Sequence, residues 1–383
     1  MKISDRANDI KPSLTRQLFN MAQDYTDVID LTLGDPDLNT SEKIKKAACD
    51  AILNNKTKYS ANAGLLNVRQ AVCKRVCDVW NVKCSTENII LTVGGMEALY
   101  LSLLSIINPG DEVIIFAPYY VNYYQMIKMC GGVPVVIDAY GKNGFEIDEN
   151  TLKESITDKT IAFIINSPNN PTGSIIDKKY LEIIYKISKE NDLYVISDEV
   201  YRSLIFDNIK HESILSFEDK AQRVILIDSL SKEYSMTGYR AGFAYANEDV
   251  IKAMTKLQEN VAACVSLPSQ YAMLYAFENN VKAHYIKEEF EKRRNYLYEK
   301  LSQSDKLSVI KPQGTFYMFV NIEKTHLKSE KFALKLLEKE HVAVVPGKSY
   351  GENYDGYIRI AFTKNIDVLK EAAERIFSFI ENI

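Results

Sequence analysis

The 383-residue chain has few of the residues that hold metals or covalent cross-links in the spacings such sites need. Its four histidines are scattered, and its six cysteines lack the paired C-x-x-C spacing of a zinc site. Structural zinc sites and disulfide frameworks both depend on such patterns. We therefore expect no metal and free thiols at all six cysteines, which are Cys49, Cys73, Cys77, Cys84, Cys130 and Cys264.

Long apolar runs and a strong excess of one charge are also lacking. The most apolar long stretch, Ile89 to Ile107, contains Gly94, Gly95 and Glu97, so its uninterrupted part is too short to span a bilayer. The formal net charge is only −4, with lysine and arginine spread along the chain. This pattern argues against nucleic acid or an anionic membrane as the main partner. The opening MKISDRANDIKPS has no apolar core, unlike a secretory signal, so we expect a cytoplasmic protein.

The length and the pattern of apolar residues predict two domains. Hydrophobic residues make up 46% of the chain and charged residues 26%, as in ordinary globular proteins. Short β-branched runs alternate with helix-like stretches, which predicts an α/β fold with a largely parallel, seven-stranded sheet between helices. The expected strands are 88–93, 112–117, 133–137, 160–166, 193–197, 224–228 and 241–246.

The pattern changes after about residue 275. A long charged helix (282–303) is followed by a strand pair around FYMFV and VAVVP and by helices at 329–340 and 366–382. The first forty residues have no strand series of their own, so we expect them to pack with this C-terminal α+β unit. The predicted division is a large domain, 45–275, and a small domain made of 1–44 and 276–383.

Polar and charged residues follow five of the expected strands. Ligands of open α/β sheets bind beyond the carboxyl ends of the strands, so these residues are expected to meet at one site. The segments that follow the strands are GGMEAL, PYY, SPNNPTG, DEVY and SLSK.

Gly94 and Gly95 end a strand and begin a helix, where unpaired backbone N–H groups favour an anion such as phosphate. A purely structural turn would need the same glycines, and no third glycine completes a dinucleotide-binding fingerprint. The segment PGKSYG resembles half of a nucleotide P-loop, but Val342 stands where that motif requires glycine. We discard the P-loop interpretation.

Lys232 has the most specific surroundings of any lysine in the chain. It follows a predicted buried strand, Ser229 and Ser231 flank it, and Arg240 could supply a further charge for a phosphate. A lone lysine is normally a solvated surface residue. Because Ser229, Ser231 and Arg240 lie close to it in the sequence, Lys232 is instead expected to be a nucleophile that forms a Schiff base.

Asp198 ends an apolar strand, where a carboxylate is costly unless a cation or strong donors meet it. A protonated pyridine nitrogen would meet that need, and Tyr201 and Asn170 can donate to the same ligand. The alternative is a capped turn with a stacked tyrosine. The run PYYVNYY offers rings that could cover a flat cofactor, or that could be ordinary core aromatics.

Together, SPNNPTG, SDEVY, SLSKEYSMTGYRAGF and YIRIAF resemble the class I and II aminotransferases of the fold-type I pyridoxal-phosphate enzymes, the aspartate aminotransferase superfamily. The resemblance extends from LTLGDPD at residues 31–37 to Arg359. It implies pyridoxal 5'-phosphate as the cofactor, with Lys232 as its Schiff-base lysine, Asp198 as the partner of the pyridine nitrogen, and Asn170 and Tyr201 as donors to the ring hydroxyl.

The resemblance assigns further residues by position. Tyr120 would stack on the cofactor, and Tyr59 would reach the phosphate of a neighbouring subunit, which implies a homodimer with shared active sites. Arg359 would clamp the substrate α-carboxylate, oriented by Gly34 and Asn170. The residues expected to bind the phosphate are Gly95, Met96, Ser229, Ser231 and Arg240.

Met96 is one departure from the family pattern, because aspartate-specific bacterial members carry lysine there. No arginine near residues 266–270 replaces it. The amino donor is therefore left open between neutral, aromatic and aspartate side chains, with 2-oxoglutarate or pyruvate as the acceptor.

The implied reaction is a ping-pong amino transfer through a Schiff base at Lys232. The nearest rival is a C–S β-lyase or related synthase on the same scaffold. Lyase relatives often have histidine where this chain has Tyr201, which favours transfer. A cofactor-sensing regulator would need an N-terminal DNA-binding module, and LTLGDPD begins already at residue 31.

Overall fold

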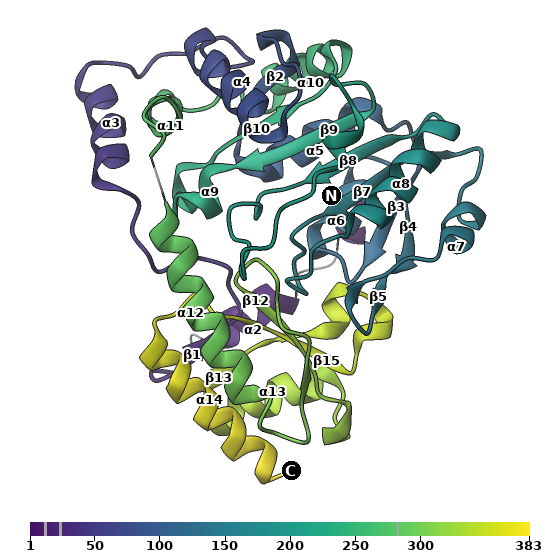
Figure 1. Ribbon diagram of the computed structural model, residues 1–383, viewed down its shortest axis with the longest axis vertical. Coiled ribbons are helices and arrows are strands. Elements are labelled where there is room, and N and C mark those ends of the chain that lie inside the picture. Colours follow the sequence, from purple (N-terminus) through teal and green to yellow (C-terminus); the bar gives the residue numbers. More distant parts are fainter. Residues whose placement is uncertain (11–13, 23–24, 282) are drawn as a thin grey trace.

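The computed structural model describes residues 1–10, 14–22, 25–281 and 283–383, and its centre is a seven-stranded sheet (Figure 1). β10 is antiparallel to its neighbours β2 and β9, whereas the other pairs of adjacent strands are parallel. In spatial order the strands are β2 (Ile89–Val93), β10 (Ala241–Tyr245), β9 (Val224–Ser229), β8 (Tyr194–Asp198), β7 (Thr160–Asn166), β3 (Glu112–Ala117) and β4 (Val133–Asp138).

Helices cover both faces of this sheet because successive strand residues point to opposite sides. Ile114 and Phe116 pack on one face, and Val113 and Ile115 on the other. The first face is covered by α4 (Leu66–Trp80), α8 (Lys178–Glu190) and α11 (Leu267–Glu278), with α3 (Glu42–Leu53) packed on α11. The second face is covered by α5 (Gly94–Ile106), α6 (Val121–Met129) and α10 (Glu248–Val261).

A smaller sheet with its own apolar core lies at the other end of the molecule (Figure 1). Its strands, in spatial order, are β11 (Ser308–Val309), β12 (Tyr317–Asn321), β15 (Tyr357–Ala361) and β14 (Val345–Pro346). The helices α12 (His284–Leu301), α13 (Ser329–Glu340) and α14 (Ile366–Glu381) contribute to this core, together with α2 (Leu14–Ala22).

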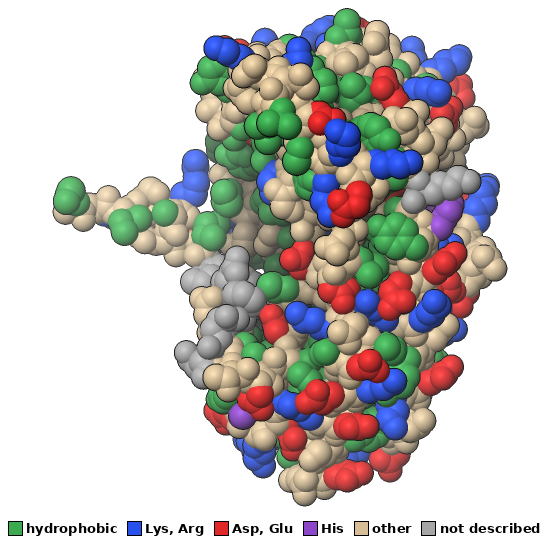
Figure 2. Space-filling model, turned by 90° about the vertical axis from the view of Figure 1, so that its left-hand side faces the viewer, with side chains coloured by type: hydrophobic (Ala, Val, Ile, Leu, Met, Phe, Trp, Pro, Cys, Tyr) green, Lys and Arg blue, Asp and Glu red, His purple; other side chains and the backbone are tan. Residues whose placement is uncertain are grey.

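The N-terminal segment joins this smaller unit by strand pairing. β1 (Ile29–Asp30) pairs in parallel with β13 (Val342–Ala343). Residues 1–9, which include α1 (Asp5–Asp9), are exposed and extend away from the body of the molecule (Figure 2).

The remaining elements are short. They are β5 (Tyr140–Gly141), β6 (Gly144–Phe145), α7 (Glu149–Glu154), α9 (Leu230–Glu233) and six 3-10 turns at Thr86–Asn88, Ile214–Phe217, Thr237–Tyr239, Glu323–Thr325, Gly347–Tyr350 and Glu352–Tyr354. No helix in the described ranges has both the length and the apolar character needed to cross a membrane.

The α/β fold predicted from the sequence is confirmed, and all seven strands of the large sheet lie within one residue of their expected bounds. The predicted pairing of FYMFV with VAVVP is wrong. β15 lies between β12 and β14, and β13 pairs with β1 instead. The long charged helix begins at His284, and residue 282, where it was expected to begin, lies outside the described residues.

Tyr245, at the end of β10, generates a stability prediction. Its side chain is fully buried, and its hydroxyl donates to Lys83 O at 2.8 Å and accepts from Ala221 N–H at 2.9 Å. Tyr245→Phe leaves both backbone groups without this partner and should lower the free energy of unfolding by about 1–3 kcal/mol. Chemical denaturation measures the loss, with Tyr296→Phe on α12 as a control expected to change stability by less than about 0.5 kcal/mol. Equal stability of the two variants would contradict the bridging role.

Candidate active site

A cavity of about 430 Å³ lies at the carboxyl ends of β7, β8 and β9, where they face the smaller sheet. Asn166, Asp198 and Ser229 are the last residues of these three strands, and Tyr317 and Arg359 enter from β12 and β15. Every site residue expected from the sequence lines this cavity except Tyr59. Those residues are Gly34, Gly95, Met96, Tyr120, Asn170, Asp198, Tyr201, Ser229, Ser231, Lys232, Arg240 and Arg359.

Lys232 projects into the cavity from α9, the short helix that follows β9 directly. Its Nζ donates to Gly34 O at 2.7 Å and lies 5.3 Å from the centre of the Phe316 ring. Burial lowers the pKa of Lys232 to about 8, Asp35 opposes this shift, and Arg240 and Arg359 add to it. A much larger fraction of this amine is therefore neutral near pH 7 than of an ordinary lysine, as a nucleophile requires.

Asp198 is a buried carboxylate at the end of β8. It accepts from Tyr123 Oη at 2.6 Å and from the Val200 N–H at 3.3 Å. Burial raises its pKa to about 6, and the bond from Tyr123 acts in the opposite direction. In the part of the chain that the structure describes, no lysine, arginine or histidine forms a salt bridge with it. A cationic group in the cavity would therefore find an ionic partner in Asp198.

The aromatic residues of the cavity form two groups. The Tyr120 ring meets Tyr123 edge-on, with centroids 5.5 Å apart, and the Tyr120 hydroxyl accepts from Asn122 Nδ2 at 2.9 Å. Met96 Sδ lies 3.6 Å from the same hydroxyl. On the opposite side, the buried Tyr201 hydroxyl lies 3.3 Å from that of Tyr317.

One end of the cavity gathers hydrogen-bond donors. Ser229 and Ser231 share a hydrogen bond of 2.8 Å, and α5 begins at Gly94 with its N-terminus beside them. Gly94 has φ +76°, a backbone conformation that requires glycine, and a Cβ there would lie 2.7 Å from Nη2 of the exposed Arg240. A helix N-terminus, two hydroxyls and a guanidinium make this end suitable for a phosphate.

Arg359 provides the cation at the other end. Its guanidinium is buried, donates to Asn170 Oδ1 at 3.0 Å and to Thr32 O, and lies 4.2 Å from the centre of the Tyr317 ring. Its buried Nε has no hydrogen-bond partner among the described residues. This end suits a small carboxylate, which an arginine can bind through two parallel bonds.

Tyr59 lies outside the cavity, and its side chain is 88% exposed. No contact among the described residues of one chain therefore explains why a tyrosine side chain is exposed at this position. The described residues also hold no group of three or more histidine, cysteine, aspartate or glutamate side chains arranged for a metal ion.

Reasoning from the sequence missed several residues that complete the cavity. Tyr123 was present only as one tyrosine in the run PYYVNYY, and Asn166 only as the last residue of an expected strand. Asn166 accepts from Asn170 N–H at 2.8 Å and donates to Asp198 O at 2.9 Å, so it links two of the expected site residues. Thr32 and Tyr317 had no signal, because their partners are more than 100 residues away in the chain.

The sequence and the fold of this chain were compared with those of known proteins, and both match aminotransferases. Residues 26–376 match the model of the family described as aminotransferase class I and II. The chain is 38% identical to the aspartate aminotransferase of Pyrococcus abyssi and 36% identical to aromatic-amino-acid aminotransferase 2 of Thermococcus litoralis, in both cases over 98% of this chain and 97% of the relative. The crystal structure of an aspartate aminotransferase from Thermotoga maritima superposes with a TM-score of 0.94 at 33% identity, covering 99% of this chain and all of that one.

The match therefore extends over almost the whole chain at an identity that is well above what the fold alone would require. The chain belongs to the class I and II aminotransferase family and is a pyridoxal-phosphate-dependent aminotransferase.

Proposed function

We propose that this enzyme transfers the amino group of a neutral or aromatic L-amino acid to 2-oxoglutarate or pyruvate, with Lys232 as the residue that binds the cofactor. The observation that carries the proposal is the placement of three groups in one cavity. The part-buried Lys232 amine, the buried Asp198 carboxylate and the buried Arg359 guanidinium all line it. They supply a nucleophile, a partner for a cationic ring and a clamp for a carboxylate.

The residues present fit pyridoxal phosphate. Asp198 lacks a cationic partner among the described residues, and a protonated pyridine nitrogen would be one. We propose that Ser229, Ser231, Arg240 and the N-terminus of α5 at Gly95 and Met96 bind the phosphate, that Tyr120 covers the ring, and that Asn170 and Tyr201 donate to its hydroxyl. When bound, the cofactor supplies an electron sink that stabilises negative charge at the substrate Cα.

Arg359 is proposed to hold the substrate α-carboxylate. Asn170 already accepts from one of its nitrogens, and the unpaired Nε leaves a further donor free. Gly34 lies close by, and a Cβ there would overlap the Tyr317 hydroxyl at 1.7 Å, so this position has no room for a side chain. A substrate fixed at its carboxylate presents its Cα to Lys232 in one orientation.

Lys232 is proposed to act twice. Its neutral amine would hold the cofactor, and once a substrate amine has taken that place, the freed amine would take the proton from the substrate Cα and hold it for return to the cofactor. The lowered pKa supports this role, since a base with a pKa near the working pH is the most effective one. Water would then release the first substrate as a 2-oxo acid while its amino group stays with the cofactor, and a second 2-oxo acid would take up that amino group by the reverse steps.

The charges around the cavity favour a neutral or aromatic donor over aspartate. Lys232, Arg240 and Arg359 are the only lysine or arginine residues among the described residues that line it, and each already has a proposed partner. Met96, Tyr120 and Asn122 instead line the wall near Tyr123. A second carboxylate on the substrate would lose its water without gaining a cation from the same chain.

We further propose a homodimer in which Tyr59 reaches the phosphate site of the partner. Support comes from four large apolar side chains within fifteen residues of sequence that are more than half exposed, Ile52, Leu53, Tyr59 and Leu66. Exposed apolar patches of this kind are typical of association surfaces. Two buried glutamine side chains bind the backbone of the segment 52–66. Gln258 donates to Asn62 O, and Gln270 accepts from Leu65 N–H.

The division into domains at residues 45 and 275 also remains a proposal. The separate apolar cores of the two sheets support it, although both boundaries fall within helices, α3 and α11, that pack on the large sheet. A cytoplasmic location is likewise proposed, and the six unpaired cysteines are those expected in a reducing compartment.

Replacement of Lys232 tests the central role. Lys232→Ala should abolish covalent cofactor attachment and lower turnover by roughly 10⁴-fold or more, because it removes both the nucleophile and the base. Borohydride reduction followed by peptide mass spectrometry measures the attachment. Lys252→Ala, on a side chain that is 63% exposed on α10, is the control and should match the wild type. Cofactor still bound covalently in Lys232→Ala would overturn the assignment.

The pKa of Lys232 predicts how the apoenzyme captures its cofactor. Only the neutral amine attacks an aldehyde, so the capture rate should rise with pH and reach half its maximum near pH 8, where burial places the pKa. Stopped-flow absorbance after mixing apoenzyme with pyridoxal phosphate measures this rate. A midpoint near 10.5, the value for an exposed lysine, would show that the amine is not buried before the cofactor binds.

A single-turnover screen tests the donor. Holoenzyme without 2-oxo acid is mixed with each common amino acid, and the cofactor absorbance shows which donors aminate it. We expect neutral or aromatic amino acids to react with a kcat/KM roughly tenfold or more above that of aspartate, because the described residues that line the cavity offer no cation without a proposed partner. Aspartate as the fastest donor would contradict the specificity. Pyruvate and ammonia released without amination of the cofactor would identify a β-lyase instead.

A further inference from the structure

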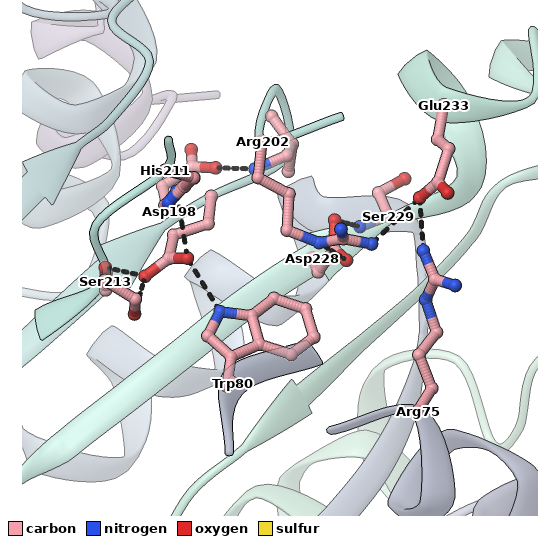
Figure 3. Close-up of polar contacts among 12 residues, drawn as sticks. Arg75, Trp80, Asp198, Arg202, His211, Ser213, Asp228, Ser229 and Glu233 are labelled. Carbon is pink, nitrogen blue, oxygen red and sulfur yellow. Dashed lines mark hydrogen bonds and ion pairs between the residues drawn. The ribbon is translucent and has the colours of Figure 1, made fainter. Parts of the chain in front are cut away.

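A cluster of buried charged side chains lies directly behind the cavity, and the proposed reaction does not use it (Figure 3). Each of four members is the sequence neighbour of a cavity residue, in the pairs Asp198–Glu199, Tyr201–Arg202, Asp228–Ser229 and Lys232–Glu233. Asp228 and Ser229 are successive residues of β9 and point to opposite sides, so Ser229 faces the cavity and Asp228 faces the cluster. The cluster therefore supports the same backbone that carries the site.

Arg202 is the centre of this cluster. Its Nε donates to Asp228 Oδ2 at 3.1 Å, and its Nη2 donates to Glu233 Oε2 at 2.9 Å. Figure 3 shows the guanidinium over the indole of Trp80, at 4.6 Å from the ring centre, with Asp228 and Glu233 on its far side. One side chain thus joins the loop after β8 to both ends of the β9–α9 turn.

Helix α4 contributes two side chains to the cluster. Arg75 donates to Glu233 Oε2 at 2.5 Å, and Trp80 Nε1 donates to Glu199 Oε2 at 2.7 Å. The other Glu199 oxygen accepts from Ser197 and Ser213. Arg202 has little freedom to move, because its planar guanidinium is bonded to two carboxylates and lies against the Trp80 ring.

Among the described residues, two arginines form the ion pairs with the acidic side chains of this cluster. Arg75 and Arg202 face three carboxylates, and burial lowers the pKa of His211 to about 4, so this histidine is neutral beside Glu199. Burial opposes ionisation of Glu233, yet Arg202 and Arg75 outweigh it and hold the pKa of Glu233 below its ordinary value. Loss of Arg202 would leave buried negative charge on both sides of the Lys232 turn.

We propose that Arg202 is a positioning residue, which fixes the turn that carries Lys232 relative to the strand end that carries Asp198. Helix α9 is a single turn of four residues, and a single turn is not stable by itself. Its geometry must come from contacts with its surroundings. Asp228 contributes a second contact, since its other oxygen accepts from Ser229 N–H at 2.7 Å. The inference rests on the proposed roles of Lys232 and Asp198, and it explains what holds these two groups at a constant separation.

A purely structural ion cluster would also lower stability when broken, so the test needs a matched arginine elsewhere. Arg294 on α12 is fully buried, forms two bonds with Asp207 at 2.7 and 2.9 Å, and lies 4.8 Å from the centre of the Phe206 ring. It does not line the cavity. Arg294→Met thus removes a similar set of contacts from the far part of the same loop, at Phe206 and Asp207, and leaves the contacts between Arg202 and the Lys232 turn in place.

The experiment compares Arg202→Met, Arg202→Lys and Arg294→Met as holoenzymes, at a temperature where circular dichroism shows all of them folded. The dissociation constant of pyridoxal phosphate, kcat and the KM of the amino donor are measured for each. For Arg202→Met we expect cofactor binding roughly tenfold weaker and kcat on the order of 100-fold lower, with little change in KM, because Arg359 still binds the substrate. Arg202→Lys keeps the charge but loses the double contact, and should fall between Arg202→Met and the wild type.

Arg294→Met should melt at a lower temperature but keep the cofactor affinity and kcat of the wild type. If Arg202→Met behaves in the same way as Arg294→Met, Arg202 only stabilises the fold and the inference is wrong. A different result concerns the proposed function itself. Wild-type enzyme that does not bind pyridoxal phosphate covalently at Lys232 would overturn that function, whatever the variants do.

Discussion

The register of three parallel strands is the constraint on which the site depends. Asn166 at the end of β7 is paired with Asp198 at the end of β8, and Asp198 is paired with Ile227, two residues before the end of β9. The three strands therefore end close together at one edge of the sheet, and their last side chains meet in one cavity. A shift of one residue in any of these strands would turn Asp198 or Ser229 away from the cavity. The apolar residues of β7, β8 and β9 are buried on both faces of the sheet, which holds these strands within the core.

This arrangement places an excess of positive charge in the cavity. Lys232, Arg240 and Arg359 line it, whereas Asp198 is the only carboxylate that does so among the described residues. Such a site favours ligands with several negative charges, as a phosphorylated cofactor and an amino-acid carboxylate together provide. The same imbalance opposes folding of the empty protein, because like charges are held close together. Binding of the cofactor should therefore stabilise the folded state through the charges as well as through mass action.

The parts of the site that could be predicted from the sequence are local. The strand ends and their polar residues follow from patterns of a few residues, and these patterns alone are enough to place Asp198, Ser229 and Lys232 at one edge of the sheet. The resemblance to a family added Arg359 and singled out Tyr120 among the tyrosines of PYYVNYY. Contacts between distant segments had no such signal. Tyr123 meets Asp198 across 75 residues, and the order of the smaller sheet depends on β15 lying between two segments that precede it in the chain. Hydrophobic patterns predict that a strand exists, but they do not state which strand lies beside it.

The loop after β8, from Tyr201 to Phe206, connects three parts of the molecule. It contributes to the cavity, to the charged cluster around Arg202 and to the contacts with the smaller sheet. Tyr201 contacts Tyr317 of β12, Leu204 O accepts from Thr315 N–H at 2.9 Å, and Phe206 N–H donates to Gln313 O at 2.8 Å. Arg202, between Tyr201 and Leu204, is bound to Asp228 and Glu233 beneath the Lys232 turn. This loop is thus one of two segments that relate Lys232 to Arg359; the other is the segment of Thr32 and Gly34, whose carbonyl groups accept from Arg359 and Lys232. An error in the position of the loop would displace the cofactor lysine and the substrate arginine relative to each other, so the loop must be held on both sides for the two ends of the reaction to meet.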